Sequence, residues 1–516
     1  MQLNKQKIKN LIEKNYTFSQ MTFDEDYVIK DNKPDVLLIV CATGMAEVEE
    51  VKSANNSVWV TGRMNFEIMY RQDGNGNVPE VIKGTIPFQE KLMVENIEDG
   101  DISKINCDVE DLSVNIINSR KISIRGIINI ESRVNEIVQY DIAQNIDGEE
   151  CEQLVDEEEF LELQVCKYDT LRVDNEFTIP KSKPNIGKIL YDFVDVRNVE
   201  MSFSGNVLNV QGELYCLIFY ISEDRENEWY DTTLNFSGSI RCDEAYDPDI
   251  YWARMNMVQK TLDIEPDYDR EMRQINLQAV FEVEIFAWKN SRLNVLRDAY
   301  SLSKNLIPQR KMLSLDRFLI KNTARNRFTE QIHMDAADDS IMQICGCKSK
   351  VRIEHSMLED DRMRVDGMLT VHMLYIASDD GFPVRCRIDQ IPFEQQIELQ
   401  GVNEKSLCRL DAGVDQLQIN LLDSREYEVK AAIHIAAIAF EKRNIIVIDE
   451  IESESYNDNE DNIPGIVGYV VQKDEKLWDI AKKYRTTMND ICSVNELETD
   501  SVKMGDKIVV VKIARI

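Results

Sequence analysis

Histidine and the signatures of enzymes are scarce in this sequence. Only four histidines occur in 516 residues, and none lies in an HExxH pattern. No GxSxG, Walker A or dinucleotide-binding fingerprint occurs, and paired carboxylates are too common in so acidic a chain to indicate a glycoside hydrolase. The sequence therefore predicts no catalytic residue, no enzymatic activity and no cofactor.

Basic residues are in deficit. The chain has 60 Lys and Arg against 93 Asp and Glu, a formal net charge of −33. Such a surface repels phosphate backbones and anionic lipid headgroups. The opening residues, MQLNKQKIKNLIEKN, lack the apolar run of a signal peptide or a membrane span. We expect a cytoplasmic protein that binds no nucleic acid and does not insert into membranes.

Cysteine, proline and glycine are too few or too irregularly spaced to indicate a disulfide-rich or low-complexity protein. Eleven cysteines, an odd number without regular spacing, indicate reduced thiols rather than disulfides. The closest pair, Cys345 and Cys347, has no second pair or nearby histidine at zinc-site spacing, so we expect no metal site. With only 11 Pro, 20 Gly and 43% hydrophobic residues, the chain should be globular, and its length predicts three to four domains.

The most informative feature is an internal repeat of a glycine followed eight residues later by a tyrosine. It occurs at Gly62 and Tyr70, at Gly212 and Tyr220, and at Gly367 and Tyr375. Apolar residues alternate with polar ones around each glycine, and this period of two predicts a long strand with one face on a core. The mid-strand glycine indicates a bulge or a close backbone approach rather than catalysis. The predicted inward residues at equivalent positions are Phe66, Cys216 and Val371.

Two further elements recur with each copy. A second alternating strand follows, centred on Gly126, Ala279 and Ala431. A proline precedes the repeat glycine by 28 residues at Pro34 and Pro184, whereas Asp339 holds this place in the third copy. The registers predict three tandem β-rich domains of one kind.

Charge and composition predict the boundaries between these domains. The segment around residues 141–162 is strongly acidic, and residues 450–465 contain no Lys or Arg, so both are interpreted as linkers. Hairpin turns are expected at residues 73–76 and 379–381. The predicted units are a first repeat in 1–135, an acidic linker in 136–172, a second repeat in 173–290, a connector in 291–330, a third repeat in 331–445, an acidic flexible linker in 446–465 and a C-terminal module in 466–516.

The C-terminal module differs from the rest in charge and pattern. Residues 468–516 hold nine Lys or Arg against eight Asp or Glu, and their periodicity predicts β-α-α-β. This stretch resembles the LysM domain. The positions that match the LysM pattern are Tyr469, Leu477, Trp478, Ile480, Ala481, Tyr484, Ile491, Asn495, Leu497, Gly505 and Ile508.

The resemblance to LysM implies a shallow groove that binds glycans containing N-acetylglucosamine. The groove would lie between two loops, one of Asp474, Glu475, Lys476 and Leu477, the other of Asn495, Glu496 and Leu497. In the family the first loop commonly reads Gly-Asp-Thr, and the charged residues here favour a protein as ligand. Trp478 is expected in the core of the module rather than in a sugar site.

The three upstream repeats resemble the SPOCS domain of proteins from spore-forming bacteria. Three SPOCS domains followed by one LysM domain imply a scaffold of spore coat assembly in the mother-cell cytoplasm. The LysM domain of such a scaffold would bind the coat basement-layer ATPase at the forespore surface. The alternative is a peptidoglycan or cortex glycan-binding protein that uses the LysM groove. The fold expected is mainly β, with a small α+β LysM domain at the end.

Overall fold

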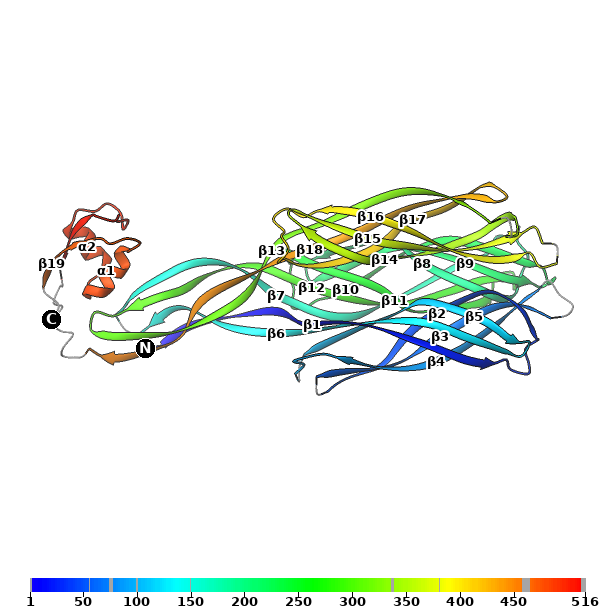
Figure 1. The fold of residues 1–516 in the computed structure, drawn as a ribbon, viewed down its shortest axis with the longest axis horizontal. Coiled ribbons are helices and arrows are strands. Elements are labelled where there is room, and N and C mark those ends of the chain that lie inside the picture. Colours follow the sequence, from blue (N-terminus) through cyan, green and yellow to red (C-terminus); the bar gives the residue numbers. More distant parts are fainter. Residues whose placement is uncertain are drawn as a thin grey trace.

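The computed structural model describes residues 2–54, 56–73, 78–98, 101–148, 150–335, 338–379, 381–456 and 465–511. Within these ranges the protein is mainly β, as the sequence predicts, with two short helices near the C-terminus (Figure 1). Residues 74–76 and Asp380 of the two expected turns, and residues 457–464 of the second expected linker, lie outside the described residues.

Each of the three domains is a sandwich of two three-stranded antiparallel sheets. In domain 1 (residues 2–147), β3 lies between β2 and β4, and β6 lies between β1 and β5. Because side chains alternate along every strand, the two inner faces supply one apolar core. The strands of domain 1 are β1 (Gln2–Val28), β2 (Val36–Ala54), β3 (Ser57–Gln72), β4 (Pro79–Met93), β5 (Ile102–Asn118) and β6 (Lys121–Asp147).

Domains 2 and 3 repeat this topology. In domain 2 (residues 152–300) the central strands are β9 and β12, and in domain 3 (residues 304–455) they are β15 and β18. The strands of domain 2 are β7 (Glu152–Thr178), β8 (Ile186–Ser204), β9 (Val207–Ser222), β10 (Asn227–Arg241), β11 (Ile250–Pro266) and β12 (Met272–Tyr300). Those of domain 3 are β13 (Lys304–His333), β14 (Ile341–Glu359), β15 (Arg362–Ala377), β16 (Val384–Glu398), β17 (Leu407–Asp423) and β18 (Glu426–Ser455).

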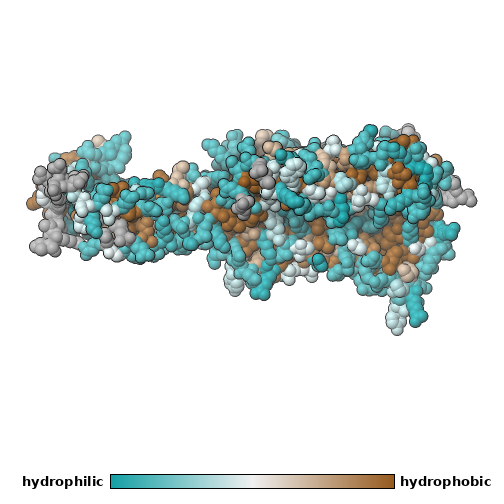
Figure 2. All heavy atoms as spheres, turned by 90° about the horizontal axis from the view of Figure 1, so that it is seen from below, coloured by the Kyte–Doolittle hydropathy of each residue, from teal (hydrophilic) through white to brown (hydrophobic). Residues whose placement is uncertain are grey.

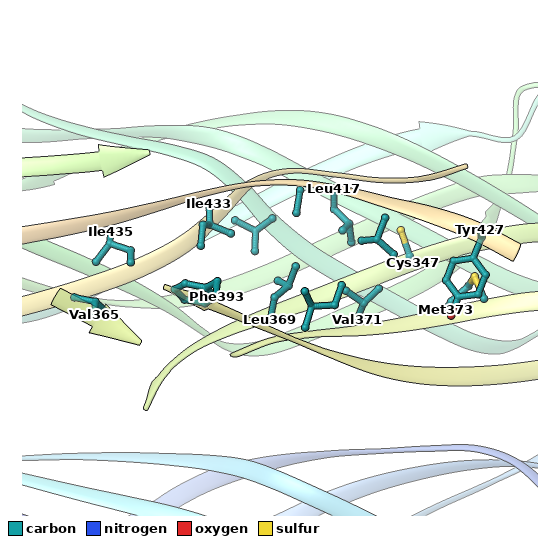
Figure 3. Close-up of a cluster of buried hydrophobic side chains, with 14 of the residues drawn as sticks. Cys347, Val365, Leu369, Val371, Met373, Phe393, Leu417, Tyr427, Ile433 and Ile435 are labelled. Carbon is teal, nitrogen blue, oxygen red and sulfur yellow. The ribbon is translucent and has the colours of Figure 1, made fainter. Parts of the chain in front are cut away.

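The predicted strand register is confirmed. Phe66, Cys216 and Val371 are all buried in the cores of their domains. Figure 3 shows the core of domain 3, where Leu369, Val371 and Met373 of β15 lie opposite side chains of β18.

Each repeat glycine lies directly beside a phenylalanine of the neighbouring strand, whose ring occupies the space that a Cβ atom would need. Gly62 pairs with Phe88, and a Cβ at Gly62 would lie 2.6 Å from the Phe88 ring and 2.4 Å from the Glu47 carbonyl oxygen. Gly367 faces Phe393 in the same way, at 2.4 Å. A β-bulge opposite each glycine interrupts the adjoining strand. The third pair is Gly212 with Phe236. The close approach predicted from the sequence is therefore confirmed.

The repeat tyrosines tie each strand to the loop before it. The Tyr70 hydroxyl donates to the Pro34 carbonyl oxygen at 3.0 Å, and the Tyr220 hydroxyl donates to that of Pro184 at 3.1 Å. Tyr375 is buried at the equivalent position of domain 3. The fixed spacing of proline, glycine and tyrosine thus reflects a buried tyrosine that needs a partner for its hydroxyl.

The structure contradicts the linker predicted at 136–172, the connector predicted at 291–330, and the part of the linker predicted at 446–465 that comprises residues 446–455. These segments are strands: β6 continues to Asp147, β7 begins at Glu152, β12 and β13 cover almost all of 291–330, and β18 continues to Ser455. The acidic residues suggested linkers because the basic residues with which they form ion pairs lie far away in the sequence. Glu158, for example, pairs with Arg297 and Arg443.

The extended strands build a second structural region, which we call the stalk. It consists of residues 2–12, 136–147, 152–161, 290–300, 304–316 and 442–455, and it projects from the three-domain body in Figure 1. Figure 2 shows it as the narrow part of the molecule. All three domains contribute to its apolar interior, including Ile8 and Ile142 of domain 1, Val295 of domain 2 and Val447 of domain 3.

The C-terminal module lies at the free end of the stalk (Figure 1). Its elements are β19 (Ile466–Val470), α1 (Leu477–Tyr484), α2 (Met488–Val494) and β20 (Lys507–Val511), and β19 pairs antiparallel with β20. The predicted β-α-α-β order is confirmed.

Candidate functional site

The two helices of the C-terminal module are fixed by local capping. The backbone N–H of Lys476 donates to the Asp479 carboxylate at 3.1 Å, and the Thr487 hydroxyl accepts from the backbone N–H of Asp490 at 3.0 Å. Both arrangements satisfy groups that a helix N-terminus leaves without partners. The apolar face of each helix then packs on the small sheet, with Ile480 and Ile491 fully buried.

The loop before α1 combines exposed charges with structural residues. Asp474 and Lys476 are exposed. The Glu475 carboxylate accepts from the Tyr469 hydroxyl at 2.7 Å, which raises the pKa of Tyr469 to about 12. Leu477, which the sequence places in the partner-binding loop, is only 2% exposed and belongs to the core of the module.

The loop after α2 also combines a structural residue with an exposed charged one. The side-chain amide of Asn495 donates to the carbonyl oxygens of Ile491 at 2.8 Å and Val509 at 2.7 Å, and its oxygen accepts from the Val509 N–H at 2.6 Å. These bonds use the amide to join α2 to β20, so Asn495 has a structural role. Glu496 is exposed and Leu497 is partly buried.

The loop before α1 and the loop after α2 are hydrogen-bonded to the two paired strands β19 and β20. Glu475 is held by Tyr469 on β19, and Asn495 is held by Val509 on β20. Tyr469 pairs directly with Ile508, the neighbour of Val509. Of the seven residues predicted to bind a partner, Asp474, Lys476 and Glu496 present exposed charged side chains.

Trp478 lies in the core of the module, as predicted, but it also contacts the stalk. Its indole N–H donates to the Asp298 carboxylate at 2.9 Å, and the Lys482 ammonium lies 2.7 Å from the same carboxylate. Burial opposes the charged form of Asp298, but the hydrogen bonds from Lys482 and Trp478 outweigh it and lower the Asp298 pKa. Arg310 adds a third donor at 3.1 Å.

Tyr300, two residues from Asp298, completes this contact. Its hydroxyl donates to the Thr486 carbonyl oxygen at 2.8 Å, and its ring meets that of Trp478 edge to face with centroids 4.9 Å apart. Sequence reasoning missed Asp298 and Tyr300. No local signal marks them, because they lie about 180 residues before their partners, as Trp478 and Asp298 show.

Burial shifts the pKa values of some cysteine and histidine side chains in the three domains. All eleven cysteines are free thiols, and burial raises the pKa of Cys347 to about 12. Burial lowers the pKa of His372 to about 3, so this histidine is neutral at physiological pH. Among the described residues, no group of three His, Cys, Asp or Glu side chains could hold a metal ion. The helices in the described part of the chain are too short and too polar to cross a bilayer.

Comparison with known proteins identifies two kinds of domain. Residues 35–117 and 340–422 match the family model described as SipL, SPOCS domain, and residues 469–511 match that of the LysM domain. The first two ranges cover β2–β5 of domain 1 and β14–β17 of domain 3. No curated protein and no solved structure matched the chain. The comparisons therefore bear out SPOCS domains in domains 1 and 3 and the LysM domain, and this combination indicates spore coat morphogenesis.

Proposed function

We propose that this chain is a non-enzymatic scaffold of the endospore envelope, acting in coat and cortex assembly. It works in the mother-cell cytoplasm at the forespore surface, where its LysM domain binds the coat morphogenetic ATPase of the basement layer. The observation that carries this proposal is the placement of the LysM domain at the end of a stalk, away from a body that contains SPOCS domains (Figure 1).

The exposed charges of the LysM loops support a protein ligand. Lys476 places a long, strongly hydrated cation in the loop before α1, and Asp474 and Glu496 add carboxylates. Charged side chains of this kind complement opposite charges on another protein better than they fit an uncharged sugar face. They act mainly on association rate and salt sensitivity, so capture of the ATPase should weaken as salt rises.

The test is capture of the purified ATPase by the full chain. Lys476→Glu should weaken capture, whereas Lys503→Glu, the same charge change at another exposed position of the domain, should not. Circular dichroism of both variants should match that of the wild type, because an exposed loop charge contributes little to stability.

A different result would favour the glycan-binding alternative. If Lys476→Glu leaves capture of the ATPase unchanged but reduces sedimentation with purified peptidoglycan, the LysM groove binds glycan and the scaffold proposal loses its mechanism.

A further inference from the structure

The face of the LysM domain formed by α1 meets the stalk through a cluster of matched polar and aromatic groups. We define the stalk tip as Asp298 and Tyr300 of β12 with Arg310 of β13. Opposite it lie Trp478 and Lys482 of α1 and Thr486. This face is separate from the exposed loop residues that the proposed function uses.

The Asp298 carboxylate joins the two parts. Its side chain is 14% exposed, and it accepts from Trp478 and Lys482 on one side and from Arg310 on the other. A carboxylate withdrawn from water this far needs several donors to compensate for its lost hydration. Two of the three residues that donate to it belong to the LysM domain.

The aromatic contact completes the fit. Tyr300 is only 3% exposed and belongs to the same apolar cluster as Leu477 and Ile480 of the LysM core, against which Leu154 and Leu302 also pack. Edge-to-face packing with Trp478 and the hydrogen bond to Thr486 fix the angle between helix and stalk. If the two parts separated, the Tyr300 ring and the Trp478 indole would both be uncovered.

The chain leaving the stalk is held at the same place. The Tyr456 hydroxyl donates to the Ser301 carbonyl oxygen at 2.8 Å, and the Arg485 guanidinium lies 3.3 Å from the centroid of the Tyr456 ring. This stacking adds a cation–π contact next to the interface.

From these contacts we infer that the α1 face of the LysM domain is a protein-binding surface whose ligand is the stalk tip of the same chain. The stalk tip offers α1 an aspartate and a tyrosine two residues apart on one strand. Docking leaves Asp474, Lys476 and Glu496 exposed, so the stalk presents the partner-binding loops in one fixed orientation. The inference goes beyond the proposed function, because it holds whatever those loops bind.

The test compares the tumbling of the LysM domain with that of the body in the intact chain. In the wild type, the transverse relaxation rates of LysM amides should equal those of the body. Asp298→Lys places a third cation beside Lys482 and Arg310, so these rates should fall several-fold while the LysM signals stay dispersed. Asp449→Lys is the matched control, because Asp449 pairs with Lys5 on the stalk and not with the LysM domain.

Two further measurements decide the assignment. Lys482→Glu should release the domain as Asp298→Lys does, and the double variant should restore part of the high transverse relaxation rates of the docked state. The wild-type rates should not depend on protein concentration. LysM amides with transverse relaxation rates well below those of the body in the wild type would overturn docking, and rates that reach those of the body only at high concentration would replace the same-chain ligand with a second copy.

Discussion

The contacts among the three domains contain a larger apolar cluster than the contact between the LysM domain and the stalk, together with ion pairs such as that of Arg352 with Glu110. The domains meet in a cluster of large apolar side chains drawn from all of them, whereas the LysM contact combines the polar groups around Asp298 with the apolar packing of Tyr300, Leu154 and Leu302. The interdomain cluster consists of Cys41, Met69, Val81, Leu190, Tyr191, Phe193, Tyr215, Leu217, Phe219, Cys345, Leu374, Phe382 and Val384.

From this difference we expect the junction among the domains to be harder to separate than the LysM contact. An interface that resembles a protein core separates only when large apolar surfaces become exposed to water. An interface built on a carboxylate and its donors depends on charge, salt and pH. We therefore expect the body to behave as one cooperative unit and the LysM domain to be the part that can be released.

Breaking the interdomain cluster should have the largest effect. Phe219→Asp would bury an unpaired carboxylate at a position that is fully buried among the three domains. The cost should be several kcal/mol, comparable with the whole stability of an ordinary domain. Urea unfolding followed by circular dichroism measures it.

Asn209→Asp is the control for that experiment, because Asn209 lies on the same strand, β9, and is exposed. Equal unfolding midpoints for the two variants would show that the cluster does not hold the domains together.

Removing the Trp478 side chain should unfold the LysM domain and leave the three-domain body folded. Trp478→Ala should destabilise the LysM domain by roughly 3–5 kcal/mol, which is most of the stability that so small a domain can have. Limited proteolysis of the full chain should then degrade the LysM region first. Loss of the body at the same protease concentration would contradict the separation between the two regions.

A smaller change should test the aromatic half of the contact. Tyr300→Phe keeps the ring against Trp478 but removes the donor to the Thr486 carbonyl oxygen, at a cost of about 0.5–1.5 kcal/mol. The docked fraction, measured from LysM amide relaxation, should fall less than in Tyr300→Ala. Identical behaviour of the two variants would mean that the ring contributes nothing.

The mildest perturbation is acid. The pKa of Asp298 is lowered in the docked state, so its charge stabilises docking above the pKa of a free aspartate, about 4, and this contribution is lost as the pH falls through the lowered value. The indole N–H resonance of Trp478 should therefore shift as the pH falls below about 4. The Asp298→Asn variant lacks the titrating group, and a shift of equal size in that variant would assign the effect to other carboxylates.

Much of the body could be predicted from sequence because its rules are local. Alternation identifies the strands around Gly62, Gly212 and Gly367 in all three domains, and the shared spacing to Tyr70 and Tyr220 reflects one hydrogen-bonded arrangement in domains 1 and 2. The stalk was missed because nothing local shows that an acidic stretch has arginines beside it.

The candidate site was predicted only in part for a similar reason. A match to a family pattern does not show whether a residue contacts the ligand or stabilises the loop. Leu477 and Asn495 proved to be structural because one fills the core and the other joins α2 to β20. The contact with Asp298 depends on the distant stalk, which only the three-dimensional structure reveals.

The lengthwise course of the stalk strands has a mechanical consequence. β12 runs without interruption from the body to the LysM contact at Tyr300, paired with β7 along nearly its whole length. Antiparallel ladder bonds lie perpendicular to the strands, so a pull along the stalk loads many of them in shear at once rather than opening them one after another. Tension between a partner held by the LysM domain and another held by the body would thus be shared along the stalk, and the smaller contact at the tip would yield first.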